Sequence, residues 1–407
     1  MTAASIPWTD EAAWVGTRKP LAEASSLPAA CYTDQDFFDL EQQRVFGTGW
    51  VPVAIADQVV KGRLLVRQIG GTSIVLTRNG DGELRGFLNS CRHRGTELAE
   101  ADCDIRNTIR CPYHRWGYNL DGTLVATPRF AEAGVEDFDP GDYGLHPVRV
   151  GRWGVLIFAC LDPTTMPLED WIGDLADRTW SYRLDEWRTV ETRDLEIKAN
   201  WKLISENFQE YYHLAWVHPE LAKVSRVEDH YRYQGPGMYC GQTTTPVSGE
   251  DRDDWVAMPP AAGLSESDAA SGRFIAVFPN VLLSLLPNHV FVMMLHPVAP
   301  GLTIETCTFL LPPSTPDVPE DGFGATRSFW FDVNDEDIGI VEAGQRGLER
   351  GGFTIGRLSP RFEEPLHRFH NMLADRFVGL DRVPPGDPND HEPRLGTKAN
   401  PLPYISG

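Results

Sequence analysis

The sequence predicts an α+β protein, with a small all-β domain and a larger domain whose central antiparallel sheet is flanked by helices. Between residues 50 and 163, short β-rich runs alternate with turn signals. From residue 164 onward, helical and strand patterns mix. The chain has 407 residues, enough for two or three domains, and 42% of them are hydrophobic, as in ordinary globular proteins.

The first expected element is an N-terminal helical segment, residues 1–49, which is assigned to the larger domain. Within it, residues 34–46 carry apolar side chains at helical spacing, and Thr33 or Asp34 supplies an N-cap. The all-β domain is expected over residues 50–163. Two turn signals predict hairpins inside it: NGDG at 79–82 and Asp121-Gly122.

The larger domain is expected over residues 164–407. Its strands are predicted near 273–278, 281–286, 289–296 and 303–311. Two helices are predicted: one from 200 to 217, ended by Pro219, and one from Asn334 or Asp335 to about Arg350. Polar stretches rich in Pro and Gly predict loops at 246–272 and 312–322 and a coil from Pro384.

Charge and composition exclude several functional classes. The chain has 37 Lys and Arg against 58 Asp and Glu, a net charge of −21, which disfavours nucleic-acid partners and anionic membranes. The sequence contains no run of about 20 apolar residues, so no membrane-spanning helix is predicted. The first residues lack the basic region of a signal peptide. Seven scattered cysteines argue against a disulfide framework and favour the reducing cytoplasm.

Two short motifs bring cysteine and histidine close together: Cys91-x-His93 and, seventeen residues later, Cys111-x2-His114. Thiolates and imidazoles suit a soft or borderline metal. A zinc site with Cys2His2 ligation and a [2Fe–2S] cluster of the Rieske type are therefore the candidates. Each motif supplies one Cys and one His. This favours the cluster, in which two cysteines hold one iron and two histidines the other.

A second group of polar residues lies at 200–220 and contains Asn207, Glu210, His213 and His218. Two histidines and one carboxylate form the facial triad of non-haem Fe(II) oxygenases. On one continuous helix, His213 and His218 would point about 140° apart. They can share an ion only if the helix bulges or ends between them, and the proline after His218 favours an end.

The stretch CRHRG…CPYHRW closely resembles the cluster motif of Rieske-type non-haem iron oxygenases, and the resemblance extends over roughly residues 27–380. It implies a Rieske [2Fe–2S] cluster on the two Cys–His pairs and a separate mononuclear Fe(II). That family usually has Gly where this chain has Arg115, at a turn position suited to φ > 0. The local turn is therefore expected to differ here.

The same resemblance implies the ligands of the second iron. His213 and His218 match the two histidines of the family's iron-binding segment. The third ligand is assigned to Asp337, because VNDEDIGIVEAGQRGL is similar to the family's C-terminal acidic segment. Asp335 and Glu336 are the alternatives for this position.

Asn207 and Glu210 match the Asn and the acidic residue that precede the two histidines in the family, and both are expected at the catalytic site. Most members acting on aromatic rings have Asp at the second position. Glu there resembles the subgroup that acts on glycine betaine, choline and carnitine. The resemblance also implies a head-to-tail homotrimer, in which Glu210 connects His114 of one protomer to His213 of the next.

The implied function is that of a terminal oxygenase. It would take electrons from a flavin-containing NAD(P)H reductase or a ferredoxin, and use O2 to demethylate or hydroxylate a quaternary ammonium compound. This chain has no Gly-rich dinucleotide fingerprint, so the nicotinamide is expected on a separate protein. Aromatic side chains that could surround such a cation are Phe208, Tyr211, Trp330 and Phe331.

Two alternatives stay open. One is hydroxylation of an aromatic ring or aromatic acid. The other is a Rieske electron carrier or a zinc-binding module without oxygenase activity.

Overall fold

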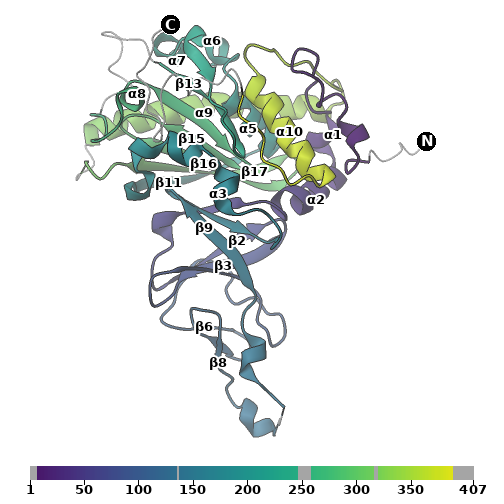
Figure 1. Cartoon of the computed structure of the whole chain (residues 1–407), viewed down its shortest axis with the longest axis vertical. Coiled ribbons are helices and arrows are strands. Elements are labelled where there is room, and N and C mark those ends of the chain that lie inside the picture. The colour runs from purple at the N-terminus through teal and green to yellow at the C-terminus, as the bar shows by residue number, and fades with distance from the viewer. Residues whose placement is uncertain (1–6, 135–136, 246–257, 316–319, 388–407) are drawn as a thin grey trace. The chain divides into compact units, whose positions relative to one another are not determined.

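The computed structural model describes residues 7–134, 137–245, 258–315 and 320–387 (Figure 1). These residues divide into two compact units. The described residues up to Val45 and from Met166 onward form the larger unit, and Phe46–Thr165 form the smaller unit.

The smaller unit is all-β, as predicted. Seven strands form one antiparallel sheet in the order β1-β10-β9-β4-β3-β2-β5, and a second sheet has the order β6-β7-β8. The strands are β1 (Val51–Ile55), β2 (Arg63–Ile69), β3 (Thr72–Arg78), β4 (Leu84–Leu88), β5 (Cys103–Asp104), β6 (Ile109–Arg110), β7 (Gly117–Tyr118), β8 (Leu124–Ala126), β9 (Pro147–Trp153) and β10 (Leu156–Cys160).

Both predicted hairpins are present, between β3 and β4 and between β7 and β8. The two turns are stabilised by the same pattern of side-chain to backbone hydrogen bonds. The side-chain oxygens of Asn79 and Asn119 each accept backbone N–H groups two and four residues farther along the chain, at 2.8 to 3.1 Å. Gly82 and Gly122 adopt positive φ angles of 87° and 86°, which glycine reaches without steric cost.

The larger unit contains a seven-stranded antiparallel sheet in the order β11-β17-β16-β15-β14-β13-β12. The strands are β11 (Arg188–Ile197), β12 (His230–Arg232), β13 (Tyr239–Thr244), β14 (Gly272–Val277), β15 (Val281–Leu285), β16 (Val290–Ala299) and β17 (Leu302–Leu311). The last four confirm the predicted strands. Every residue of β15 is buried, as expected for a strand covered on both faces.

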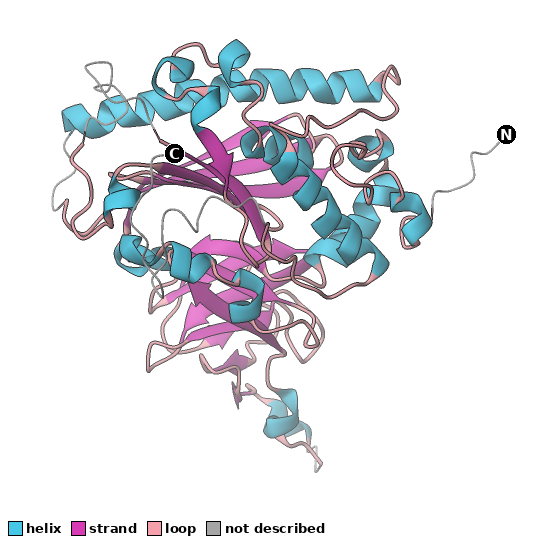
Figure 2. Cartoon of the chain, turned by 45° about the horizontal axis from the view of Figure 1, so that its top comes forward, coloured by secondary structure: helices cyan, strands magenta, loops and turns pink. Residues whose placement is uncertain are grey.

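The helices of the larger unit are α1 (Ala30–Thr33), α2 (Gln35–Glu41), α3 (Leu168–Ile172), α4 (Leu175–Arg178), α5 (Trp201–Gln209), α6 (Leu214–Val217), α7 (Leu221–Val224), α8 (Glu266–Ala269), α9 (Glu320–Glu349) and α10 (Glu364–Val378). Helix α5 packs between α9 and strands β13, β14 and β16, and α10 packs on β13 (Figure 2). Within the described ranges, no helix has the length and apolar character to cross a bilayer.

A buried ion pair anchors the helix that leads to the functional site. Lys202 Nζ on α5 lies 2.7 Å from Glu41 Oε1 on α2, and both side chains are fully buried. The indole N–H of Trp201 donates to the other oxygen of Glu41 at 2.8 Å. At the start of α2, Asp34 accepts the N–H of Phe37, as the predicted N-cap requires.

Two helix predictions are wrong in their limits. Helix α5 ends at Gln209 instead of 217, because Glu210 adopts an extended conformation (φ −109°, ψ 163°). Helix α9 begins at Glu320, so Asn334 and Asp335 lie inside the helix and do not cap it. Glycines near its start lower the local helix propensity. Burial of one face compensates for this loss: Phe323, Thr326, Trp330 and Asn334.

Three predicted irregular segments lie only partly within the described residues. Of the loop predicted at 312–322, residues 312–315 and 320–322 are described, and the last three already belong to α9, so the prediction is wrong at that end. Of the loop predicted at 246–272, residues 258–272 are described, and they contain the short helix α8. Of the coil predicted from Pro384, residues 384–387 are described and have no regular secondary structure.

Candidate metal centres

Two loops of the smaller unit present the Cys–His pairs. Cys91 and His93 follow β4, and Cys111 and His114 lie between β6 and β7. In each loop, the N–H four residues after the cysteine donates to the cysteine carbonyl, at 2.8 and 3.2 Å. The cysteine N–H donates to the carbonyl five residues onward, at 2.8 and 2.9 Å. Arg115 adopts the same left-handed conformation (φ 63°) as Gly95 (φ 76°), so the difference expected in the local turn is absent. Two loops with the same hydrogen-bond pattern therefore supply equivalent ligand pairs.

The chemistry of these side chains fits a two-iron cluster. Cys91 and Cys111 are buried, and the ring centroids of His93 and His114 lie 4.7 Å apart. In the described part of the chain, both histidine Nδ1 atoms are buried and have no hydrogen-bond partner. Such orphaned atoms are uncommon, and two iron bonds account for them. The ring of His93 stacks on Trp116, with centroids 4.7 Å apart, which fixes its orientation.

A single zinc ion does not fit the same residues. Tetrahedral zinc draws its ligand atoms to within about 4 Å of one another. Among the described residues, the only group of three or more ligands that converges within 4.8 Å is His213, His218 and Asp337. The Cys–His pairs are therefore spread over more than one ion, as two irons require.

His213 and His218 lie at the two ends of the helical turn α6. His213 precedes it, and His218 follows it with φ −117° and ψ 70°. Because α6 ends at Val217 and His218 leaves the helical conformation, the two histidines do not share a continuous helix. Their ring centroids lie 5.1 Å apart. The break that the five-residue spacing demands is therefore present.

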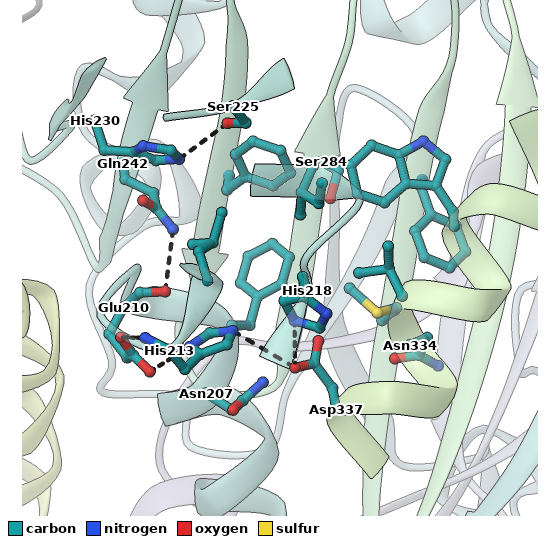
Figure 3. Close-up of a pocket in the computed structure, with 18 residues that line it drawn as sticks. Asn207, Glu210, His213, His218, Ser225, His230, Gln242, Ser284, Asn334 and Asp337 are labelled. Atoms are coloured by element: carbon teal, nitrogen blue, oxygen red, sulfur yellow. Dashed lines mark hydrogen bonds and ion pairs between the residues drawn. The ribbon is translucent and has the colours of Figure 1, made fainter. Parts of the chain in front are cut away.

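Asp337 on α9 completes this group (Figure 3). Its Oδ1 atom lies 2.8 Å from His218 Nε2 and 3.6 Å from His213 Nε2. Glu336 instead binds the opposite ring nitrogen, His218 Nδ1, at 2.7 Å, and so orients that ring. Asp335 is not part of the converging group. Burial lowers the pKa of His218, but the Asp337 and Glu336 carboxylates outweigh it and raise the pKa above its ordinary value.

Glu210 and Asn207 lie on the same side of the group. The Glu210 carboxylate contacts His213 Nδ1 and accepts the backbone N–H of His213 at 3.2 Å. This leaves His213 Nε2 facing Asp337. Asn207, in the last turn of α5, lines the same pocket, and Figure 3 shows its amide beside His213 and Asp337.

The pocket next to these residues has a mostly aromatic and apolar lining: Phe208, Leu214, Leu221, Phe274, Phe291, Met293, Trp330 and Val333. Among the described residues that line it, Glu210 and Asp337 are the only acids, and none is Lys or Arg. Electrostatically, the pocket therefore favours a cation over an anion.

Of the four proposed cage residues, Phe208 and Trp330 line the pocket. Tyr211 and Phe331 do not. The Tyr211 hydroxyl donates to a backbone carbonyl at 2.8 Å, and Phe331 packs behind Phe291, with ring centroids 6.2 Å apart.

Polar residues around this pocket include several that sequence reasoning did not identify. His230 Nδ1 bonds a backbone carbonyl at 2.8 Å, its Nε2 lies 3.3 Å from Ser225 Oγ, and burial lowers its pKa to about 4. The amide of Asn334 donates to Glu305 at 2.8 Å. Burial raises the pKa of Glu305 to about 7. The sequence signal that could have identified Glu305 is its position as the only acid in the strand-forming run 302–311.

Comparison with known proteins gives matches to two families. Residues 49–139 match the Rieske [2Fe–2S] domain. Residues 184–379 match the ring hydroxylating alpha subunit (catalytic domain). The first match contains both Cys–His pairs, and the second contains His213, His218 and Asp337.

Curated relatives align over most of the chain. The oxygenase subunit of glycine betaine monooxygenase from Pseudomonas aeruginosa is 26% identical, covering 87% of this chain and 89% of its own length. The oxygenase subunit of carnitine monooxygenase from Escherichia coli is 29% identical, covering 87% and 94%. Chloroplastic choline monooxygenase from Arabidopsis thaliana is 26% identical, covering 87% and 83%.

A solved structure shows the same fold. The quaternary ammonium Rieske monooxygenase CntA superposes with a TM-score of 0.76 at 24% identity, covering 89% of this chain and 98% of that chain. The two domain matches, the two sets of candidate metal ligands and the curated relatives all indicate the same family. This chain therefore belongs to the Rieske non-haem iron oxygenases, and its cofactors are a Rieske [2Fe–2S] cluster and a mononuclear iron.

Proposed function

We propose that this chain is the terminal oxygenase component of a quaternary ammonium monooxygenase and that it removes an N-methyl group from its substrate. The observation that carries this proposal is the pocket beside His213, His218 and Asp337. It presents aromatic ring faces and has no Lys or Arg among its described lining residues, which suits a permanently charged ammonium group.

The proposed metal ligands follow from the donor atoms. Cys91 and Cys111 would hold one iron of the cluster, and His93 and His114 the other through Nδ1. His213, His218 and Asp337 would hold the mononuclear iron and leave positions open for O2. When bound, the cluster supplies single electrons and the mononuclear iron supplies the centre at which O2 is activated.

The residues of the pocket would orient the substrate. Phe208 and Trp330 would bind the ammonium group through their ring faces and place one methyl group beside Asp337. His230 is neutral at pH 7, so it adds no positive charge that would repel the cation. The apolar lining excludes water from the reacting carbon.

The overall reaction balances with two electrons. Substrate, O2, two electrons and two protons give water and a hydroxymethyl ammonium compound. That product is a hemiaminal, which releases formaldehyde and a proton and leaves a tertiary amine. The electrons would come from NAD(P)H through a separate flavin-containing reductase or a ferredoxin.

The proposed assembly is a homotrimer with head-to-tail contacts. In it, the Glu210 carboxylate would accept N–H groups from His114 of one protomer and His213 of another, and so connect the two centres. The Glu210–His213 contact within this chain supports that role. We also propose that the chain works in the reducing cytoplasm, because its scattered cysteines do not predict a disulfide framework.

The decisive experiment supplies the holoenzyme with NADH, a flavin reductase and O2. Glycine betaine, choline, carnitine and benzoate are tested separately, and formaldehyde and hydroxylated products are measured. Formaldehyde in step with NADH oxidation is expected from at least one quaternary ammonium compound. Hydroxylated benzoate without formaldehyde would instead support action on aromatic acids and contradict the proposal.

A Glu210→Ala variant tests the electron path. We expect it to retain about three irons per chain and the cluster absorbance, because Glu210 ligates neither centre. Substrate-coupled turnover should be lost. Normal turnover in this variant would refute the bridging role.

A further inference from the structure

The pocket beside the mononuclear site has a polar end that lies apart from the metal ligands. This polar end is defined as four residues that line the pocket: Ser225, His230, Gln242 and Ser284. Figure 3 shows it in the upper part of the view, whereas His213, His218 and Asp337 lie in the lower part. A substrate that holds one methyl group beside Asp337 would extend its other end toward these polar residues. Their hydrogen-bonding chemistry therefore selects the substrate.

Gln242, on strand β13, contributes an acceptor without a partner. Its side-chain N–H donates to the carbonyl of Glu210 at 3.4 Å, and this contact fixes which way the amide points. The other amide atom, Oε1, is buried and has no hydrogen-bond partner in the described part of the chain. A buried acceptor that stays unpaired is costly. A ligand that donates a hydrogen bond to this oxygen would remove that cost.

The proton of the Ser225 hydroxyl is already used within the polar end. His230 donates from Nδ1 to a backbone carbonyl at 2.8 Å. Burial lowers the pKa of His230 to about 4, so the ring is neutral at pH 7 and its Nε2 carries no proton. Nε2 therefore accepts from the Ser225 hydroxyl, 3.3 Å away. Thr244 Oγ1 lies 3.4 Å from the same oxygen, which leaves Ser225 at least one lone pair for a ligand.

Side-chain donors are scarce in the described lining, and no Lys or Arg belongs to it. Away from the metal ligands, the donors left for a ligand are the Ser284 hydroxyl and the Trp330 indole N–H. The indole nitrogen is buried and has no hydrogen-bond partner within the described ranges. Two neutral donors do not replace the water that a buried carboxylate loses. A hydroxyl group, by contrast, is uncharged, donates to one acceptor and still accepts from a donor such as Ser284.

We infer that the end of the substrate opposite the reacting methyl group is uncharged and donates a hydrogen bond to Gln242. The preferred substrate is therefore a quaternary ammonium alcohol, and betaines that carry a carboxylate are poor ligands. This inference rests on the proposed function and narrows its substrate class. Gln242 is the residue that distinguishes the alcohol from the betaine.

The test measures binding to the holoenzyme by isothermal titration calorimetry without reductase, so that the result does not depend on turnover. The ligands are choline, glycine betaine and propyltrimethylammonium, in which a methyl group replaces the hydroxyl group of choline. Choline should bind about 10- to 100-fold more tightly than propyltrimethylammonium, because the latter leaves Gln242 Oε1 unpaired. Glycine betaine should bind at least about 100-fold more weakly than choline, because its carboxylate would be buried among acceptors.

A Gln242→Leu variant removes the acceptor and keeps a side chain of similar size. It should bind choline about 10-fold or more weakly and propyltrimethylammonium at least as well as wild type, so that the preference between the two disappears. A general packing defect would instead weaken both ligands together. Thr243→Val is the matched control, because Thr243 is the next residue of β13 and its hydroxyl donates to the Gly272 carbonyl at 3.2 Å. It should keep the wild-type preference.

Equal binding of choline and propyltrimethylammonium by the wild-type protein would overturn the inference, and so would glycine betaine binding as tightly as choline. Formaldehyde is then measured with NADH, a flavin reductase and O2. Formaldehyde from choline supports both the inference and the proposed function. An aldehyde that retains all three methyl groups would place the hydroxyl end at the iron and overturn the inference. Tight choline binding without turnover of any quaternary ammonium compound would refute the proposed function and leave the assignment of Gln242 intact. If none of the three ligands binds, both are refuted.

Discussion

Replacing Glu305 with glutamine is expected to stabilise the protein above pH 7 and to have a much smaller effect at pH 5. Glu305 on β17 is fully buried, accepts from Asn334 at 2.8 Å and lies 3.5 Å from the Cys307 thiol. Burial raises its pKa from an ordinary 4.5 to about 7, although the two hydrogen bonds oppose the shift. Glutamine has the same shape and carries no charge.

The magnitude follows from linkage between protonation and folding. The folded state holds the proton more tightly than the unfolded state, so this carboxyl reduces stability as the pH rises from about 4.5 through 7. One pKa unit corresponds to about 1.4 kcal/mol, which gives a full penalty of about 3 kcal/mol above pH 8. Between pH 5 and pH 8, the stability advantage of the variant should grow by about 2–3 kcal/mol.

The assay is thermal unfolding of wild type and Glu305→Gln at pH 5, 6, 7 and 8, followed by circular dichroism. Chelator-treated protein is used, because a divalent ion at Asp337 would lower the pKa of Glu305. For a unit of this size, each kcal/mol shifts Tm by about 2–4 °C. The difference in Tm between Glu305→Gln and wild type should therefore widen by about 5–10 °C from pH 5 to pH 8.

A matched control is Glu228→Gln, which removes a carboxylate whose side chain is 70% exposed. Its Tm difference from wild type should stay nearly constant with pH. If the Glu305→Gln difference is equally constant, Glu305 is ionised at pH 5 in the folded protein, and the reasoning from burial fails.

Three further predictions concern the site and its support. His213→Ala should lower the iron content from about three to about two per chain and keep the cluster absorbance, because the cluster ligands are untouched. Phe208→Ala and Trp330→Ala should each raise KM for the active quaternary ammonium substrate about 5- to 30-fold with a smaller change in kcat, as loss of a desolvated cation–π contact requires. Lys202→Met should lower the free energy of unfolding by about 3–5 kcal/mol, because the buried Glu41 carboxylate loses its counter-ion and keeps only the Trp201 hydrogen bond, and adding Glu41→Gln should restore most of it in a denaturant titration.

The sequence was sufficient to predict those features of the fold and the site that depend on residues close together in the chain. The two Cys–His motifs lie on short loops, and the Asn and Gly turn signals specify the hairpins beside them. Strands β14 to β17 were predictable because apolar runs alternate with Pro and Asn breaks. Each of these features is decided within about ten residues of the chain.

Features that depend on distant contacts were not predictable. Helix α9 begins fourteen residues before Asn334, because burial against the sheet outweighs its glycines. Helix α5 stops at Gln209, where the Glu210 carboxylate accepts the N–H of His213 and competes with helix continuation. The raised pKa of Glu305 depends on burial by elements that are distant in the chain, and its hydrogen-bond partner Asn334 lies on α9 and not on the same strand. No local pattern encodes that pairing.

The arrangement of the mononuclear site also determines what can attract a cation into the pocket. A divalent iron on Asp337 and two neutral histidines leaves a net charge of about +1. Within the pocket lining, Glu210 reduces this charge to about zero, and Glu336, which binds His218 from outside the lining, is 44% exposed and therefore screened by water. When the iron is bound, its positive charge therefore largely neutralises the Asp337 and Glu210 carboxylates. Little net negative charge remains in the pocket to attract a substrate. The ring faces of Phe208 and Trp330 keep their attraction for a cation, since a quadrupole is not neutralised by the ion. Substrate affinity in the loaded enzyme should accordingly depend more on these two rings than on the pocket's acids.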